Sequence, residues 1–228
     1  MARTIRKQKV TGTGKDAARQ ARRARRHESS REDILAAARR VLVRSGVAAT
    51  TLEAVAAEAG MSKAGLYYYF ASKDALLFEL VFSTLDVQAH AVHDAVQKTD
   101  SGADALRAVI GQTVNYYASH LDDFRLAYLF GQVAGPGAVH LDAEQFARVR
   151  PLNELCFADA ARKIAEGRKR QSGRARVEPR LMAFLAHLAA IGILTMKGMV
   201  ENLDDPLLYS DAQLVEGFAR IFEAAAAT

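Results

Sequence analysis

The sequence contains one cysteine, four prolines and no tryptophan, and each shortage narrows what the chain can be. With Cys156 alone, no intramolecular disulfide can form, and a reducing cytoplasm is the expected compartment. Few prolines, scarce β-branched runs and abundant alanine and leucine favour helices over sheet. Half of the residues are hydrophobic and a quarter are charged, which is typical of a globular chain rather than a disordered one.

Long clean apolar runs are also missing. The longest stretch, residues 181–200, is interrupted by His187 and Lys197, whereas a membrane span needs about 20 apolar residues. A buried helix is predicted there instead. The first residues are too basic and too polar for a signal peptide. We therefore expect a cytoplasmic protein with no membrane partner.

Basic charge is concentrated at the N-terminus. Residues 1–28 hold ten Lys or Arg against two acids, a net charge of +8, whereas the whole chain carries +5. A block of like charge without apolar periodicity predicts a disordered arm that binds nucleic acid; a solubilising tail is the alternative. The basic residues of the arm are densest just before the first predicted helix, at Arg22, Arg23, Arg25 and Arg26.

The rest of the chain divides into helices. Ser29 and Thr50 each stand three residues before a glutamate, as in a capping box, and Gly46 and Gly60 each follow an apolar helical face. The predicted fold is all-α, with an N-terminal three-helix head in residues 29–75 and a larger C-terminal helical bundle in residues 76–228. The longer helices of the bundle are expected at about 103–121, 123–133, 142–169, 178–203 and 210–226.

Residues 51–70, TLEAVAAEAGMSKAGLYYYF, have the spacing of a helix-turn-helix. Ala56 lies where two short helices would cross, and a larger side chain would push them apart. Gly60 lies where the turn needs a positive φ, which glycine adopts without steric cost. Val55 and Leu66 supply apolar contacts against the first helix. Two amphipathic helices that meet at a glycine by chance are the alternative reading.

The second helix of this motif is expected to face DNA. It carries three consecutive tyrosines beside Lys63, and phenol hydroxyls and ammonium groups both bind phosphate oxygens. Ala64 and Gly65 are small enough for the backbone to approach a groove, which would explain a helix-weakening glycine. At least one tyrosine, Tyr67, is expected to be packed rather than exposed.

These residues resemble the head of the TetR-type repressors. The resemblance covers about residues 30–77 and rests on Thr51, Val55-Ala56, Ala59-Gly60, Ser62, Leu66-Tyr67, Tyr69-Phe70, Ser72-Lys73 and Leu76. It implies an all-helical dimer whose third helix enters the major groove. The DNA contacts that it implies are Thr51, Ser62, Lys63, Ala64, Gly65, Tyr68, Tyr69 and Lys73. Many members have glycine two residues after the serine, where this chain has Ala64 and then Gly65. Many members also have histidine where Tyr69 stands. These two differences leave the operator sequence open.

The resemblance also implies a small-molecule pocket and a dimer interface in the C-terminal bundle. Residues 104–135 are rich in aromatics, which suit a ligand pocket. The expected lining is Tyr117, Phe124, Tyr128, Phe157 and His187. The dimer would form through the last two long helices, at Leu185, Leu188, Ala189, Gly192 and Thr195; an internal core face is the alternative.

No catalytic constellation or cofactor motif is recognisable, so we expect neither an enzyme nor a cofactor. His90 and His93 have the spacing of two metal ligands, but a polar helix face is the preferred interpretation and no metal site is predicted. The sequence thus predicts a repressor that binds palindromic operator DNA as a homodimer and is released by a small-molecule effector. A DNA-binding architectural protein without an effector is the alternative, because only the bundle argues for sensing; a helical enzyme is disfavoured.

Overall fold

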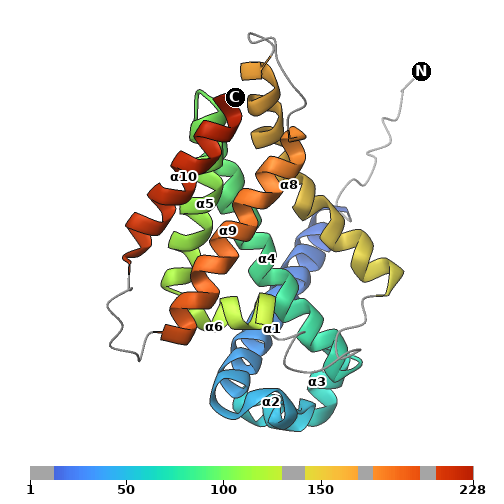
Figure 1. The fold of residues 1–228 in the computed structure, drawn as a ribbon. Coiled ribbons are helices and arrows are strands. Elements are labelled where there is room, and N and C mark those ends of the chain that lie inside the picture. Colours follow the sequence, from blue (N-terminus) through green and yellow to red (C-terminus); the bar gives the residue numbers. More distant parts are fainter. Residues whose placement is uncertain (1–12, 130–141, 169–176, 201–208, 228) are drawn as a thin grey trace, which may run out of the picture. The chain divides into compact units, whose positions relative to one another are not determined.

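The computed structural model of the chain describes residues 13–129, 142–168, 177–200 and 209–227. Every regular element in these ranges is a helix, which confirms the predicted all-α fold. The chain forms two compact units, Met1–Leu77 and Phe78–Thr228 (Figure 1). The first contains the helix-turn-helix head and the second the larger helical bundle.

The first unit is built on α1 (Thr13–Ala49), which packs against α2 (Leu52–Glu58); α2 in turn packs against α3 (Lys63–Tyr69). Ile34 and Val41 of α1 are buried together with Val55 of α2 and Leu66 of α3. Gly46, at φ 73°, breaks the helical path of α1 near its carboxyl end. Gly60 in the turn between α2 and α3 has φ 66°, as the sequence predicts. The apolar core of the head is thus formed by side chains of α1 together with those of the helix-turn-helix motif.

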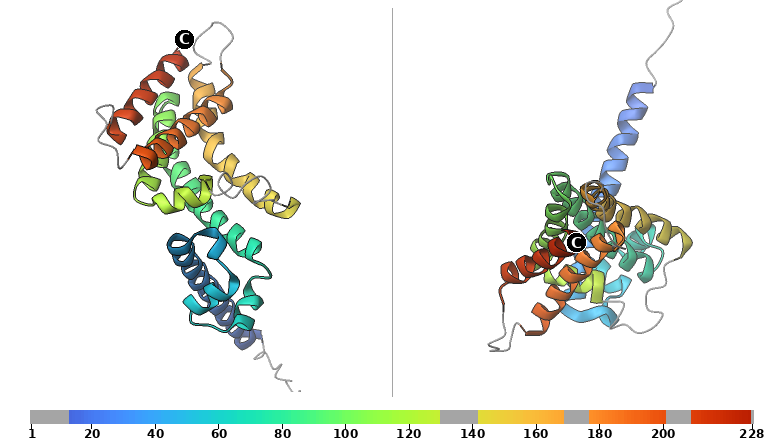
Figure 2. Two further views of the ribbon diagram at one scale, coloured as in Figure 1. Left: turned by 60° about the horizontal axis from the view of Figure 1, so that its bottom comes forward. Right: turned by 45° about the horizontal axis from the view of Figure 1, so that its top comes forward.

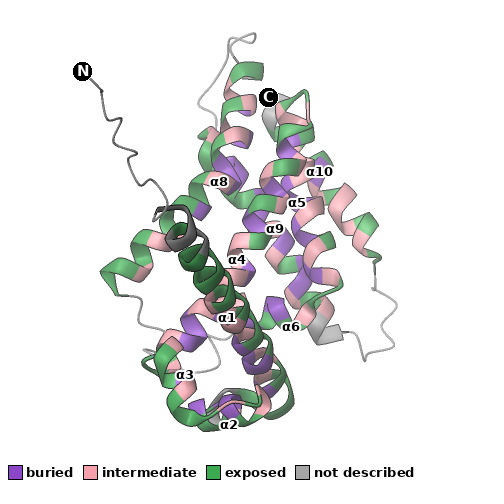
Figure 3. Cartoon of the chain, turned by 180° about the vertical axis from the view of Figure 1, so that it is seen from behind, coloured by how far each residue is buried: buried purple, intermediate pink, exposed green. Residues whose placement is uncertain are grey.

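The N-terminal arm differs from its prediction. Helix α1 begins at Thr13 rather than at Ser29, so residues 13–28 are helical and not disordered, while residues 1–12 lie outside the described part of the chain. This segment consists mainly of Ala and Arg, which are strong helix formers. It extends an existing helix, so no new nucleation is needed. Figure 3 shows its exposed surface and the buried face of α1 beside α2.

Two predicted helix starts are also placed differently. Ser29 lies inside α1. Thr50 is buried and donates to the Gly46 carbonyl over 2.8 Å, while the neighbouring Thr51 caps α2 by accepting from the Ala54 amide. Thr50 and Thr51 are adjacent, so spacing in the sequence does not decide which of them caps α2. The path of the chain after Gly46 determines which hydroxyl faces the helix end.

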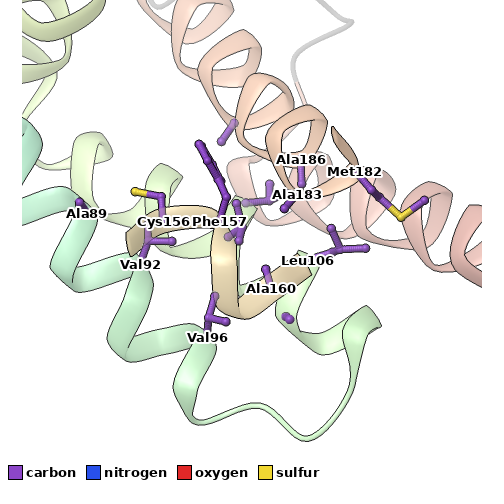
Figure 4. Packing of buried hydrophobic residues seen from close by; sticks show 14 of the residues in the cluster. Ala89, Val92, Val96, Leu106, Cys156, Phe157, Ala160, Met182, Ala183 and Ala186 are labelled. Carbon is purple, nitrogen blue, oxygen red and sulfur yellow. The ribbon is translucent and has the colours of Figure 1, made fainter. Parts of the chain in front are cut away.

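The second unit is a bundle centred on α5 (Gly102–Ala118). It contacts the long helices α8 (Ala143–Arg168), α9 (Pro179–Val200) and α10 (Asp211–Ala227). Helix α4 (Lys73–Gln97) contributes Val92 and Val96 to the same core, where Cys156 and Phe157 of α8 are also buried (Figure 4). Figure 2 shows the long helices from two further directions.

A short break after α5 leads into α6 (Leu121–Phe124), which continues as a π-helical turn, η1 (Arg125–Leu129). Single π turns are rare and are found often at functional sites. Phe124 is buried at the end of α6, and Tyr128 lies in the π turn beside it, with their ring centroids 5.4 Å apart. The turn therefore brings both aromatic rings into one cluster with α5.

Helix α4, and α9 as far as Lys197, are long and apolar enough to cross a membrane by length and composition. Helix α9 buries one face in the bundle, including Met182, Ala186 and Ala190. Its other face exposes Leu185 and Leu188. The predicted buried helix is therefore buried on one side only.

Candidate nucleic-acid interface and effector site

Helix α3 begins at a well-formed cap. The Gly65 amide donates to Ser62 Oγ over 3.0 Å. A Cβ at Gly65 would lie 3.2 Å from that oxygen, tighter than ordinary contact. The glycine therefore has a local reason, close packing against its own cap, in addition to the predicted approach to a groove.

The exposed side chains of α3 form a continuous polar and aromatic surface. Lys63, Ala64 and Tyr68 are exposed, together with the cap residue Ser62. Tyr67 is 45% exposed, so the expectation that it is packed is wrong. Its ring lies under the Lys63 ammonium, at 5.7 Å, because the i, i+4 spacing places the two side chains on one face.

Tyr69 is the half-buried member of the tyrosine run. Its ring is 4.7 Å from that of His27 on α1, and His27 also contacts the edge of Tyr68 at 5.8 Å. Two of the predicted DNA-contacting tyrosines are therefore positioned by the N-terminal extension. The role of His27 could not be found from the sequence, because nothing in its spacing shows that a helical extension would reach α3.

Lys63 forms an ion pair with Glu53 of α2. The hydrogen bond from Lys63 is the main cause that lowers the pKa of Glu53, and the same contact raises the pKa of Lys63. Both side chains are more than half exposed, so solvent screens the pair. In the free protein, the predicted phosphate-binding ammonium is thus partly neutralised by a neighbour that the sequence suggests only as a capping residue.

The two remaining predicted contacts flank α3. Thr51 is exposed at the N-cap of α2, where a helix end attracts anions. Lys73 is the half-buried first residue of α4, which Ser72 caps by accepting from the Ala75 amide over 3.0 Å. Both belong to the first unit, as do α2 and α3.

Most of the arginines in the helical part of the arm lie on one side of α1. Arg22, Arg23, Arg25 and Arg26 are all exposed. Successive residues are rotated by about 100°, so Arg19, Arg22, Arg23 and Arg26 fall within an arc of about 100°, with Arg25 about 60° outside it. Helix formation therefore converts a run of charge into a basic face.

In the second unit, the five predicted effector-lining residues lie in one cluster. The Tyr117 ring contacts Phe124 at 5.6 Å and Tyr128 at 5.7 Å, and the His187 ring contacts Tyr128 at 5.9 Å and Phe157 at 5.5 Å. They come from α5, α6, η1, α8 and α9. The structure thus brings together residues that are up to 70 positions apart in sequence.

Burial governs the titration of this cluster. Loss of hydration is the main cause that raises the pKa values of the Tyr117 and Tyr128 hydroxyls. It also lowers the pKa of His187 to about 4, so the imidazole is neutral at pH 7. The Tyr128 hydroxyl and His187 Nε2 are 3.2 Å apart and form a hydrogen bond.

The other residues considered from sequence have structural roles. His93 Nδ1 lies 3.3 Å from an Asp159 oxygen but without hydrogen-bond geometry, and no cluster of metal-binding side chains occurs in the described residues. Cys156 is buried, and burial raises its thiol pKa to about 12. A surface hollow of about 440 Å³ on α8, beside Phe146 and Arg150, includes none of the predicted lining residues.

Residues 34–80 match the sequence model of bacterial regulatory proteins of the tetR family. No curated protein sequence matches the chain. The sequence match confirms the resemblance noted from the motif, and it spans α2, α3 and parts of α1 and α4.

Several solved structures have a similar fold along most of the chain. The transcriptional regulator FadR from Bacillus subtilis, solved with stearoyl-CoA, is 14% identical, with a TM-score of 0.65 over 85% of this chain and 98% of FadR. A TetR/AcrR-family regulator from Thermobifida fusca is 24% identical, with a TM-score of 0.62 over 84% and 95%. AibR, solved with isovaleryl coenzyme A and operator DNA, is 21% identical, with a TM-score of 0.58 over 84% and 97%.

Proposed function

Because residues 34–80 match the sequence model of bacterial regulatory proteins of the tetR family, we propose that the chain is an effector-responsive transcriptional repressor of that family. It would bind a palindromic operator as a homodimer in the cytoplasm and be released by a small molecule. The observation that carries this proposal is the capped helix α3, which exposes Ser62, Lys63 and Tyr68 together.

The exposed groups of the head suit a DNA backbone and base edges. Hydroxyl and ammonium donors on α3 can bind phosphates or reach the groove, while Thr51 offers a second anchor at the start of α2. Arg22 and Arg26 on the helical extension add charge that attracts the phosphate backbone at long range. The head thus combines a short reading helix with a separate source of electrostatic affinity.

A homodimer is supported by the exposed apolar face of α9. Leu181, Phe184, Leu185 and Leu188 are each between 38% and 47% exposed, and Gly192 on the same helix is also exposed. Within this chain the face is therefore not internal core, which was the alternative. A two-fold interface through α9 and α10 would supply the matched pair of heads that a palindromic operator requires.

An effector is supported by the buried cluster around Tyr128 and by proteins of similar fold. FadR was solved with stearoyl-CoA, and AibR with isovaleryl coenzyme A and operator DNA. Acyl-CoA molecules are therefore the first effectors to test with this chain. A bundle of this size also argues against the architectural alternative, which needs DNA binding only.

The test measures binding to the DNA upstream of the protein's own gene by fluorescence anisotropy, with an unrelated duplex as competitor. Alanine at Tyr68 should weaken specific binding about tenfold and leave the melting temperature unchanged, because the side chain is 67% exposed. Phenylalanine at the same position is the matched control for loss of the hydroxyl alone. Equal affinity for specific and unrelated DNA would favour the architectural alternative, and an unaffected Tyr68→Ala variant would contradict the assigned contact.

A further inference from the structure

Two polar atoms in the buried aromatic cluster have no hydrogen-bond partner among the described residues. They are the hydroxyl of Tyr117 and Nδ1 of His187, in side chains that are 0% and 8% exposed. The Tyr117 and Tyr128 hydroxyls are close enough for each to shift the pKa of the other through their charge and a hydrogen-bond contribution, but the two groups do not have hydrogen-bond geometry, so the Tyr117 hydroxyl has no partner. Buried polar groups without partners are rare in folded proteins because they lose their hydration without compensation.

The hydroxyl of Tyr128, in the same cluster, does have a hydrogen-bond partner, in contrast to these two atoms. This hydroxyl bonds His187 Nε2, which fixes the imidazole and leaves the opposite nitrogen, Nδ1, without a partner. Tyr128 stands in the π turn η1, while Tyr117 and His187 are held by the long helices α5 and α9. The two unpartnered atoms are therefore on rigid elements, on either side of a residue in a rarer helical turn.

The charge around the cluster restricts what it can bind. The groups that act on the hydroxyls of Tyr117 and Tyr128 are other tyrosines, the Cys156 thiol and the Asp123 carboxylate, which are neutral or negative. His187 is neutral at pH 7 because burial lowers its pKa. A carboxylate placed here would lose hydration, and the nearest charge would repel it.

Resting on the proposed function, we propose that the Tyr117 hydroxyl and His187 Nδ1 hydrogen-bond one oxygen of the effector, a largely apolar molecule whose polar group there is an uncharged carbonyl or hydroxyl. The rings of Phe124, Tyr128 and Phe157 pack against its apolar part. The oxygen can belong to a free ketone or alcohol, or to the thioester of an acyl-CoA whose charged groups lie outside the cluster. A free fatty acid does not satisfy this site.

The first test compares two tyrosine-to-phenylalanine changes in the effector-free protein. Tyr117→Phe removes a hydroxyl without a partner and should raise the melting temperature by about 2–4 °C. Tyr128→Phe removes a hydroxyl bonded to His187 and should lower it. If Tyr117→Phe lowers the melting temperature as Tyr128→Phe does, the Tyr117 hydroxyl already has a partner in the free protein and the proposal is refuted.

The second test measures binding of three probes with the same chain length, octan-2-one, octanoate and octanoyl-CoA, to the full-length protein by calorimetry. Binding of the ketone or the thioester, at least tenfold weaker in Tyr117→Phe, supports the proposal, and the stronger of the two identifies the source of the oxygen. Binding of octanoate alone, an unchanged affinity in Tyr117→Phe, or no binding of any probe overturns it. Operator binding without probe is measured on the same samples, so that failure of the regulator function is seen separately.

Discussion

Neutralising the basic face of α1 should weaken DNA binding in a way that depends on salt. The perturbation replaces Arg22, Arg23, Arg25 and Arg26 together with glutamine. Glutamine is nearly as good a helix former as arginine, so the helical extension is kept and only the charge is lost. Each phosphate that the protein neutralises contributes about 0.9 to the slope of log affinity against log salt.

The structure limits the size of this effect. Four contacts would contribute roughly 3.6 to the slope, but the four side chains spread over about 160° of the helix surface and cannot all face one duplex. Loss of two or three contacts, about 2–3 units of slope, is therefore expected. A loss of about 2 units changes the affinity ratio between variant and parent roughly 16-fold when salt rises fourfold.

The assay is fluorescence anisotropy with operator and unrelated duplexes at several KCl concentrations. Circular dichroism of the variant verifies that the helix persists, and the matched control replaces the same four arginines with lysine, which should preserve the slope. Binding to both duplexes should weaken, since phosphate contacts carry no sequence information. Equal slopes for the glutamine variant and the parent would refute the reasoning and reduce the extension to a solubilising segment.

Three further changes test other contacts. Glu53→Gln should release Lys63 from its ion pair and tighten operator binding severalfold at low salt. It should also steepen the slope of log affinity against log salt by about 0.9. Glu53→Asp is the control, and an unchanged slope in Glu53→Gln would mean that Lys63 contacts no phosphate. Lys163→Met should lower the free energy of unfolding, measured in urea at fixed protein concentration, by about 2 kcal/mol. The reason is that the Lys163 ammonium donates to the Val96, Gln97 and Thr99 carbonyls at the end of α4. Lys163→Arg, which keeps the charge, is the control, and equal stability of the two variants would contradict this role. Leu188→Asp should give monomers in sedimentation. The control is Val87→Asp, at an exposed valine of α4 outside the proposed interface, and a dimer as stable as that of this control would place the interface elsewhere.

Several features of this protein could be read from the sequence because they depend on local rules. The all-α fold follows from composition and helical periodicity, and the turn of the head follows from Gly60, whose positive φ is a property of the residue itself. The Ser62 and Ser72 caps follow from short-range spacing. The five effector-lining candidates are found together, although their choice rested on the family resemblance as well as on aromatic content.

Other features were decided by tertiary structure. Local propensity makes residues 13–28 able to form a helix, but their continuity with the rest of α1 and the contact of His27 with Tyr69 place that helix beside α3. The ion pair between Glu53 and Lys63, and the exposure of Tyr67, depend on the crossing of α2 and α3. Whether the buried hydroxyl of Tyr117 has a hydrogen-bond partner depends on which side chains surround it in the folded bundle. Sequence spacing encodes contacts within one or two helical turns, whereas contacts between helices depend on packing angles that no short segment specifies.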